Sequence, residues 1–397
     1  MSSAVFRSPM TIIYGRDSFV SIGKETAKRG KKALIISDPV MDSLGFVSQC
    51  RNYLREEGVE NVVYLGVKSE PTDVYVSEGL ELLQQENCDV IISLGGGSCI
   101  DTAKAIAVVA SNEGYIGDYM GMQKIAEKAP IPHLAIPTTA GTGSEVTDVT
   151  VITNTTTDVK MMIKQPSFLP AVAVVDPLLT ISSPKSVTAS TGIDALSHAI
   201  EAYISRRAHP MTDVIALSAM ELIVRNIETA YHNGENVEAR EAMSLGAMQA
   251  GLAFSNASVC LVHGMSRPIG ALFNVPHGLS NAMLLPAVLE FSKEACISRL
   301  ADLGRIFDER AKDLSDDESA EVAITSVKNL CSELKITNLK DWGIDSKEFE
   351  KAIDKMATDA LASGSPQNNP KVPTKDEIKE LYHICYNYQY ETQKEYS

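Results

Sequence analysis

Asp194 and His198 can bind a metal ion and stand four positions apart in a stretch of small and apolar residues. On a helix this spacing puts both side chains on one face. A carboxylate and an imidazole in apolar surroundings need a partner, either each other through a hydrogen bond or a shared cation. The pair taken alone favours the hydrogen bond, so further ligands are needed to indicate a metal.

Two later histidines, His263 and His277, change that balance. Each is followed by glycine and lies in an apolar setting, and Pro268 and Pro276 make one continuous helix between them unlikely to form. We therefore expect His263 on one helix and His277 at the start of the next. Each alone is more typical of a hydrogen-bonded core histidine. With the earlier pair they make one carboxylate and three imidazoles, a set that suits Fe²⁺, Zn²⁺, Mn²⁺ or Co²⁺.

A glycine-rich turn, Gly95–Gly97, follows an apolar run and opens a helical pattern. Glycines let the backbone approach a ligand closely, and the free N–H groups of a helix start suit a pyrophosphate. Ser98 is expected to cap this helix in a capping-box-like pair with Asp101. The alternative is a glycine-rich turn that binds nothing, because a lone glycine cluster is a weak signal.

Two other segments are candidates for binding a nucleotide. Asp38 ends an earlier strand, where a carboxylate can accept hydrogen bonds from ribose hydroxyls and repel a 2′-phosphate, which favours NAD over NADP. A plain Asx turn at 37–39 explains Asp38 equally well. The loop 136–145 contains several hydroxyls and two glycines, which can surround a phosphate or ribose. The alternative for this loop is a solvent-exposed Ser/Thr turn.

Hydrophobic patterns indicate the elements that must position these residues. In the first part of the chain, apolar runs alternate with helical patterns, which is typical of a parallel sheet covered by helices. Strands are expected at 32–37, 61–66, 89–94, 133–136, 145–153, 159–163 and 171–175, and helices at 42–57, 73–86 and 101–111.

Beyond about residue 177 the strand patterns nearly vanish. Long helical patterns follow at 184–205, 210–232, 236–254, 277–291, 293–307, 318–334, 346–362 and 373–388. We therefore predict an α/β N-terminal nucleotide-binding domain with a mainly parallel sheet over 1–182, and an all-α C-terminal helical domain over 183–397.

Composition narrows the classes of partner. The 397 residues carry a net charge of −15, which argues against nucleic acid or an anionic membrane as partner. The seven cysteines are an odd number and form no CxxC pair, which indicates a reduced protein without disulfides. Neither a signal peptide nor an apolar run long enough to span a membrane is found, so we expect a cytoplasmic protein.

Four segments together resemble the iron-containing (group III) alcohol dehydrogenases, which share the dehydroquinate synthase-like fold. They are 95–106 (GGGSCIDTAKAI), 137–147 (PTTAGTGSEVT), 192–203 (GIDALSHAIEAY) and 263–286, which begins HGMSRP. The resemblance covers essentially the whole chain, in the family's order. It implies metal-assisted hydride transfer between NAD and a primary alcohol or aldehyde, and a homodimer or higher homo-oligomer.

The resemblance also assigns roles to single residues. It implies that Fe²⁺, or Zn²⁺ or another divalent metal, is held by Asp194, His198, His263 and His277. It implies cofactor contacts from Asp38, Gly96, Gly97, Ser98, Thr138, Thr139, Thr142 and Lys160. Phe254 is either part of an apolar substrate wall or an ordinary core residue.

Two positions depart from the family pattern. Arg267 stands where many members have a histidine four residues after the one that matches His263, and arginine cannot relay a proton at neutral pH. Arginine can instead grip a carboxylate. Glu70 stands where many members have an asparagine that contacts the cofactor, so the chain departs from the family at this contact. Alternatives are therefore a diol, lactaldehyde or hydroxy-acid dehydrogenase on the same fold, or a nucleotide- and metal-binding protein without catalysis.

Overall fold

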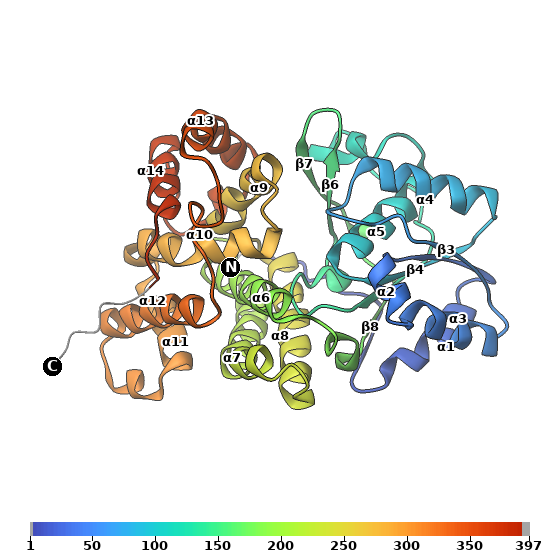
Figure 1. Ribbon diagram of the computed structural model, residues 1–397, viewed down its shortest axis with the longest axis horizontal. Helices are drawn as coiled ribbons and strands as arrows, with labels where there is room; N and C mark the ends of the chain where they lie inside the picture. The colour runs from blue at the N-terminus through green and yellow to red at the C-terminus, as the bar shows by residue number, and fades with distance from the viewer. Residues whose placement is uncertain (1–2, 391–397) are drawn as a thin grey trace. The chain divides into compact units, whose positions relative to one another are not determined.

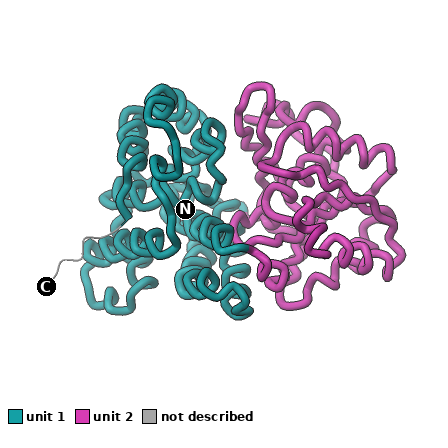
Figure 2. The backbone as a smooth tube through the Cα atoms, viewed as in Figure 1, with its two compact units in different colours: residues 1–5, 184–397 teal, residues 6–183 magenta. Residues whose placement is uncertain are grey.

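The computed structural model describes residues 3–390, which belong to two compact units. One unit comprises residues 6–183, and the other comprises residues 184–397 with 1–5, as far as these are described (Figure 2). The predicted domains, 1–182 and 183–397, have nearly the same limits as the two units. That the first domain binds the nucleotide and the second binds the metal and substrate stays a prediction.

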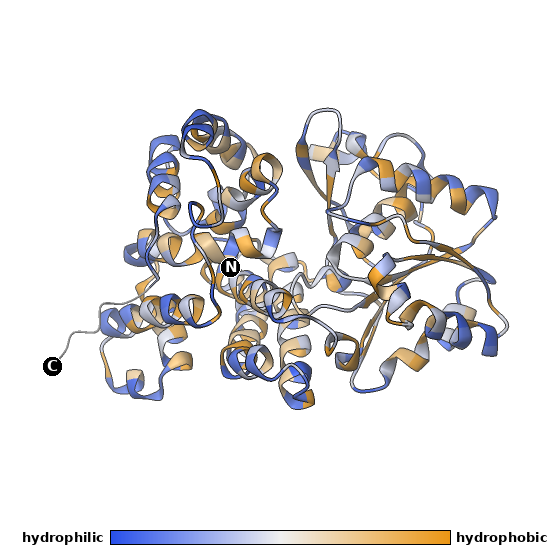
Figure 3. Cartoon of the chain, viewed as in Figure 1, coloured by the Kyte–Doolittle hydropathy of each residue, from blue (hydrophilic) through white to orange (hydrophobic). Residues whose placement is uncertain are grey.

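A six-stranded parallel sheet forms the centre of the first unit (Figure 1). The strand order is β1-β8-β5-β4-β2-β3. The strands are β1 (Thr11–Tyr14), β2 (Lys32–Ile36), β3 (Glu60–Tyr64), β4 (Val90–Gly95), β5 (His133–Pro137) and β8 (Val172–Val175). Strands β4, β5 and β8 are buried along their whole length, because helices cover both faces of the sheet. Figure 3 shows hydrophobic residues running along the strands.

The helices of this unit form two layers. Apolar cores join the sheet to α4 (Asp73–Gln85) and α5 (Gly97–Asn112) on one face, and to α1 (Ile22–Ala27) and α3 (Phe46–Glu56) on the other. The predicted helix 42–57 is wrong as one element. It is divided into α2 (Pro39–Ser43) and α3, because Gly45 adopts a φ of +82° between them.

The predicted strand 145–153 starts later than expected. Ser144–Val146 form a short 3-10 helix, and the strand β6 spans Val149–Asn154. It pairs antiparallel with β7 (Val159–Lys164) in a separate hairpin beside α5. The predicted strands 145–153 and 159–163 therefore do not join the main parallel sheet.

The second unit is helical throughout its described part. Its helices are α6 (Lys185–Ile204), α7 (Pro210–His232), α8 (Val237–Asn256), α9 (Leu261–Phe273), α10 (His277–Ser292), α11 (Ile297–Phe307), α12 (Asp316–Glu333), α13 (Ser346–Ala362) and α14 (Lys375–Tyr386). Helix α6 packs against α7, α8 and α10, and almost every residue of its second half is buried. Polar side chains on α6 are therefore enclosed by other helices.

No single helix in the described part of the chain is long and apolar enough to cross a membrane. The pair α8 and α9, bent by 102° at its break, passes the same test of length and composition when taken together.

Candidate metal centre

Helix α6 carries the first two candidate ligands. Asp194 and His198 lie one turn apart and are both buried, as their spacing predicted. His198 Nδ1 is 4.0 Å from Asp194 Oδ1, which is too far for a direct hydrogen bond. The simplest alternative to a metal site, a mutual Asp–His hydrogen bond, is therefore not formed.

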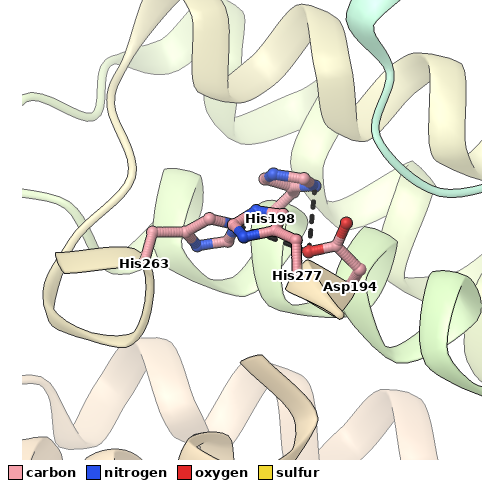
Figure 4. A group of neighbouring side chains, drawn as sticks. All are labelled: Asp194, His198, His263 and His277. Atoms are coloured by element: carbon pink, nitrogen blue, oxygen red, sulfur yellow. Dashed lines mark ion pairs between the residues drawn. The ribbon is translucent and has the colours of Figure 1, made fainter. Parts of the chain in front are cut away.

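The two other histidines come from different helices. His263 lies in the first turn of α9, and His277 is the first residue of α10, as predicted. His263 Nε2 is 3.5 Å from Asp194 Oδ1, and the His263 ring stacks on His198 with the centroids 4.3 Å apart. Figure 4 shows the side chains of Asp194, His198, His263 and His277 converging.

The spacing of the four donor groups matches one cation. One ligand atom from each residue lies within 4.8 Å of the other three. Ligands at about 2.1 Å from a tetrahedral ion lie roughly 3.4 Å apart, so a small inward adjustment suffices. The structure thus brings together all four residues that the sequence predicted as ligands.

A glycine allows α10 to approach α6 this closely. A Cβ at Gly278 would lie only 2.7 Å from the carbonyl oxygen of Ser190 and 3.2 Å from Cβ of Asp194. Any larger residue would push His277 away from α6, because that contact is with backbone. The glycine after His277 therefore has a packing role that its position in the sequence indicated only weakly.

Electrostatics at the cluster favour positive charge. Burial raises the pKa of Asp194, but the neighbouring imidazoles, above all His198, outweigh it and hold the pKa below its usual range. Burial lowers the pKa of His263, while Glu201 and Asp194 raise it more, so the net shift is upward. Groups that stabilise a protonated imidazole here would stabilise a divalent cation in the same way.

Sequence reasoning missed two polar residues at the cluster, Asn281 and Glu201. Asn281 Nδ2 donates to Asp194 Oδ1 at 2.6 Å and lies 3.0 Å from His263 Nε2 and 3.3 Å from His277 Nε2. Its Oδ1 is buried and has no hydrogen-bond partner among the described residues. The spacing of four from His277 was the signal that could have found Asn281. The partly positive amide contacts three of the four donor atoms, so this donor set already attracts positive charge.

Phe254 and Arg267 also lie beside the cluster. The Phe254 ring stacks on His198, with centroids 4.2 Å apart and an interplanar angle of 17°. Phe254 is therefore in direct contact with a candidate ligand. Arg267 follows His263 by one turn of α9, is only 9% exposed, and donates from Nη1 to Ser365 Oγ at 3.1 Å.

In the α/β unit, Asp38 lies at the end of β2 and caps α2. Its Oδ1 accepts hydrogen bonds from the backbone N–H groups of Val40 and Met41 at 2.8 and 3.0 Å. The Asx turn that the sequence allowed is therefore present. The second oxygen, Oδ2, lies 3.7 Å from Cys99 Sγ, beside the glycine turn at the end of the neighbouring strand β4. One oxygen is thus committed to the turn, and the other faces the residues that follow β4.

The glycine turn (95–97) and the loop 136–145, called the Thr-rich loop from here on, pack against each other. A Cβ at Gly97 would lie 2.8 Å from Thr142 Cγ2, and one at Gly96 would lie 3.6 Å from Thr139 Oγ1. Thr138 is buried, and its backbone N–H donates to the carbonyl of Gly95 at 3.1 Å. These predicted cofactor residues are therefore neighbours at one edge of the sheet.

The predicted capping of α5 by Ser98 is wrong. The helix begins at Gly97 with Gly96 as its N-cap residue, and no side chain caps it. Asp101 instead accepts hydrogen bonds from Ser144 Oγ and from the backbone N–H of Val151 at 2.8 Å. The first N–H groups of the helix are therefore not taken up by a cap, which is the arrangement that an anion needs.

Lys104 and Lys160 differ in their surroundings. Lys104 is buried and donates to Ser144 Oγ, Thr147 Oγ1 and the carbonyl of Val149, and burial lowers its pKa to about 8. It fixes the end of the Thr-rich loop, a role that the sequence did not reveal. Lys160, the predicted cofactor contact, lies on β7 with its Nζ 3.3 Å from Glu70 Oε2.

Comparison with known proteins identifies the family. A family model described as "Iron-containing alcohol dehydrogenase" matches residues 9–177, and one described as "Fe-containing alcohol dehydrogenase family, C-terminal" matches residues 188–386. The chain belongs to the iron-containing alcohol dehydrogenase family. Membership in this family makes it an oxidoreductase of the alcohol dehydrogenase type. The α/β unit and the helical unit confirm the predicted fold class.

Individual members of the family are similar over nearly their full length. The 1,3-propanediol dehydrogenase of Citrobacter freundii is 40% identical over 356 residues, covering 89% of this chain and 91% of that protein. The NAD-dependent methanol dehydrogenase of Bacillus methanolicus is 38% identical, covering 95% and 98%. A crystal structure of 1,3-propanediol oxidoreductase has a TM-score of 0.93 at 37% identity, covering 96% and 100%.

Proposed function

We propose that this family member is an NAD-dependent alcohol dehydrogenase with one divalent metal ion, iron as the family name implies, bound by Asp194, His198, His263 and His277. The observation that carries the proposal is the convergence of these four donor groups from three helices. A carboxylate with three imidazoles binds Fe²⁺ or Zn²⁺ well, and the absence of cysteine from this set argues against a structural zinc site.

When bound, a divalent ion supplies Lewis acidity toward an alcohol or carbonyl oxygen. The protein positions the ligands through buried helices, so little reorganisation is needed when charge develops on that oxygen. Phe254 covers one face of His198 and gives the cluster an apolar border. An apolar border excludes water and strengthens the interaction between the ligands and the ion.

For the cofactor, we propose that the pyrophosphate of NAD binds at the start of α5. The N–H groups near Gly96, Gly97 and Ser98 form the anion site, and Thr138, Thr139 and Thr142 add donors from the adjoining loop. Asp38 Oδ2 would accept from the ribose hydroxyls and disfavour a 2′-phosphate. Lys160 would give a further contact with the cofactor, and its ion pair with Glu70 competes with that contact.

We propose a primary alcohol as the substrate, with a short diol as the second candidate. The diol is favoured by the names of the 1,3-propanediol dehydrogenase and oxidoreductase to which the chain is similar. Arg267 is a weaker argument for a hydroxy acid, because its guanidinium is buried and hydrogen-bonded to Ser365. We further propose a cytoplasmic homo-oligomer, which light scattering would test.

The experiment uses chelator-treated protein that is reloaded separately with Fe²⁺, Zn²⁺ and Co²⁺. NADH formation is followed with ethanol, 1,3-propanediol, lactaldehyde and lactate as substrates. We expect activity only in reloaded protein, with NAD preferred over NADP and with the neutral alcohol or diol preferred over lactate. Full activity after complete metal removal would contradict the proposal, and tight metal and NAD binding without NADH formation would indicate a non-catalytic protein.

A further inference from the structure

Glu201 forms a buried link between α6 and α9. It lies one turn after His198 on α6 and is 1% exposed. Its Oε2 is 2.6 Å from His263 Nδ1, and its Oε1 accepts from the backbone N–H of Val262 at 2.6 Å. Both oxygens of one carboxylate are therefore committed to the first turn of α9, which includes a candidate metal ligand.

This contact fixes which nitrogen of His263 can bind a metal. A carboxylate accepts hydrogen bonds, so Nδ1 of the ring must carry a hydrogen. The lone pair of a neutral ring then lies on Nε2, the atom that is 3.5 Å from Asp194 Oδ1. The bond also sets the rotation of the ring, because the second oxygen of Glu201 holds the backbone next to it.

We propose that Glu201 is a positioning residue of the metal centre, which holds His263 in the Nδ1–H tautomer and directs Nε2 toward the ion. The inference rests on the proposed function and extends it beyond the four ligands. A carboxylate in this position also raises the basicity of the imidazole, and removing such partners elsewhere costs about 10- to 100-fold in metal affinity.

Arg267 is a buried cationic side chain on the same helix as His263. It lies one turn after His263 on α9 and is almost fully buried. Burial lowers the pKa of Arg267 to about 10, and the negative charge of Glu201 opposes that shift. The printed hydrogen bond of Arg267 goes to Ser365 Oγ at 3.1 Å, so this side chain is held by Ser365.

The first test measures Co²⁺ binding to chelator-treated protein by calorimetry and by the visible Co²⁺ spectrum. We expect Glu201→Ala to weaken Co²⁺ binding about 10- to 100-fold, and Glu201→Gln to weaken it less, because the amide oxygen can still accept from Nδ1. The control is Asp213→Asn on α7, which removes a carboxylate paired with Arg299 at 2.9 Å and is expected to leave Co²⁺ affinity unchanged.

The second test reads the tautomer directly in metal-free protein, at a pH above the raised pKa of His263 so that the ring is neutral. With ¹⁵N-labelled histidine, NMR should show His263 as the Nδ1–H tautomer in the wild-type and Glu201→Gln proteins, and as a mixture in Glu201→Ala. A purely structural role for Glu201 would lower the melting temperature without changing either the tautomer or the Co²⁺ spectrum.

The outcomes separate the two proposals. If wild-type protein binds no Co²⁺, the metal site and this inference both fail. If wild-type protein binds Co²⁺ and Glu201→Ala binds it equally well with His263 unchanged, the inference fails while the proposed function stands. If Glu201→Ala does not fold, two other results together would overturn the inference. The first is that Glu201→Gln leaves the Co²⁺ affinity and spectrum unchanged. The second is that wild-type His263 is not the Nδ1–H tautomer.

Discussion

The proposed metal cluster and the proposed nucleotide-binding edge would use different parts of the chain for binding. The cluster depends on a few buried side chains from α6, α9 and α10, each with a particular charge and direction. The edge depends on backbone N–H groups, glycines and threonines at the ends of strands. Loss of one side chain should therefore destroy the cluster, whereas the edge should be damaged mainly by added bulk or a changed charge.

The largest effect is expected from His263→Ala. Loss of one imidazole and of its bond to Glu201 should abolish stoichiometric metal binding. Activity should fall by about a thousandfold or more, because Lewis-acid stabilisation is worth several kcal/mol. Metal analysis and NADH formation would measure both effects.

The matched control is His232→Ala on α7, whose imidazole is half exposed and pairs with Glu333 at 2.9 Å. It should retain metal and activity. Equal metal content in His263→Ala and His232→Ala would show that the loss of one ligand does not destroy the cluster, so the cluster would not differ from the nucleotide-binding edge in this respect.

The next effect is expected from Gly97→Val. A Cβ at this position meets Thr142 Cγ2 at 2.8 Å, so the loop must move away from the start of α5. We expect KM for NAD to rise about tenfold or more, by the loss of one or two hydrogen bonds to a charged group, with metal content unchanged. Kinetics with NAD would measure this.

A second substitution sharpens the same prediction. Thr142→Ser removes Cγ2, the atom nearest to the added Cβ, and keeps the hydroxyl that is proposed to contact the cofactor, so Gly97→Val with Thr142→Ser should recover part of the NAD affinity. A double variant no better than Gly97→Val would show that the close contact with Thr142 is not the cause.

A smaller effect is expected from Asp38→Asn. Asparagine still caps α2 but carries no charge, so the preference for NAD over NADP should fall by about tenfold while stability changes little. Asp38→Gly should change the preference similarly and also lower stability by a few tenths of a kcal/mol. Kinetics with both cofactors and thermal unfolding would separate the capping role from the ribose role, and an unchanged preference in both variants would exclude the latter.

The smallest effect is expected from Glu70→Asn. The Glu70 side chain is 45% exposed and that of Lys160 is 6% exposed, so their ion pair is partly solvated and is expected to contribute about 1 kcal/mol. Releasing Lys160 should lower KM for NAD by about two- to fivefold at low salt. The difference should shrink at high salt. A rise in KM instead would mean that Glu70 itself supports the cofactor.

The family and the overall fold could be predicted from the sequence, and so could the four converging residues. Alternating apolar runs predicted the parallel sheet, and the glycine turn predicted a helix after β4, but α5 begins at Gly97 and not at the expected residue 101. Errors arose where local rules competed with packing. Ser98 was expected to cap α5, but the cap position belongs to Gly96, and Asp101 is held by the hairpin and the Thr-rich loop. Strand β1 was missed, since its four half-buried residues pair only with β8.

The sequence by itself determined which residues can carry charge and bind metal, because spacing along a helix or at a strand end follows from local geometry. Only the tertiary structure decided how these residues are supported. Glu201 holds His263, and Asn281 contacts Asp194, across separations of 62 and 87 residues. Contacts between distant segments leave no local pattern, since they depend on how closely whole helices pack. That packing buried Glu201 against the first turn of α9, which its neighbours in the sequence do not indicate.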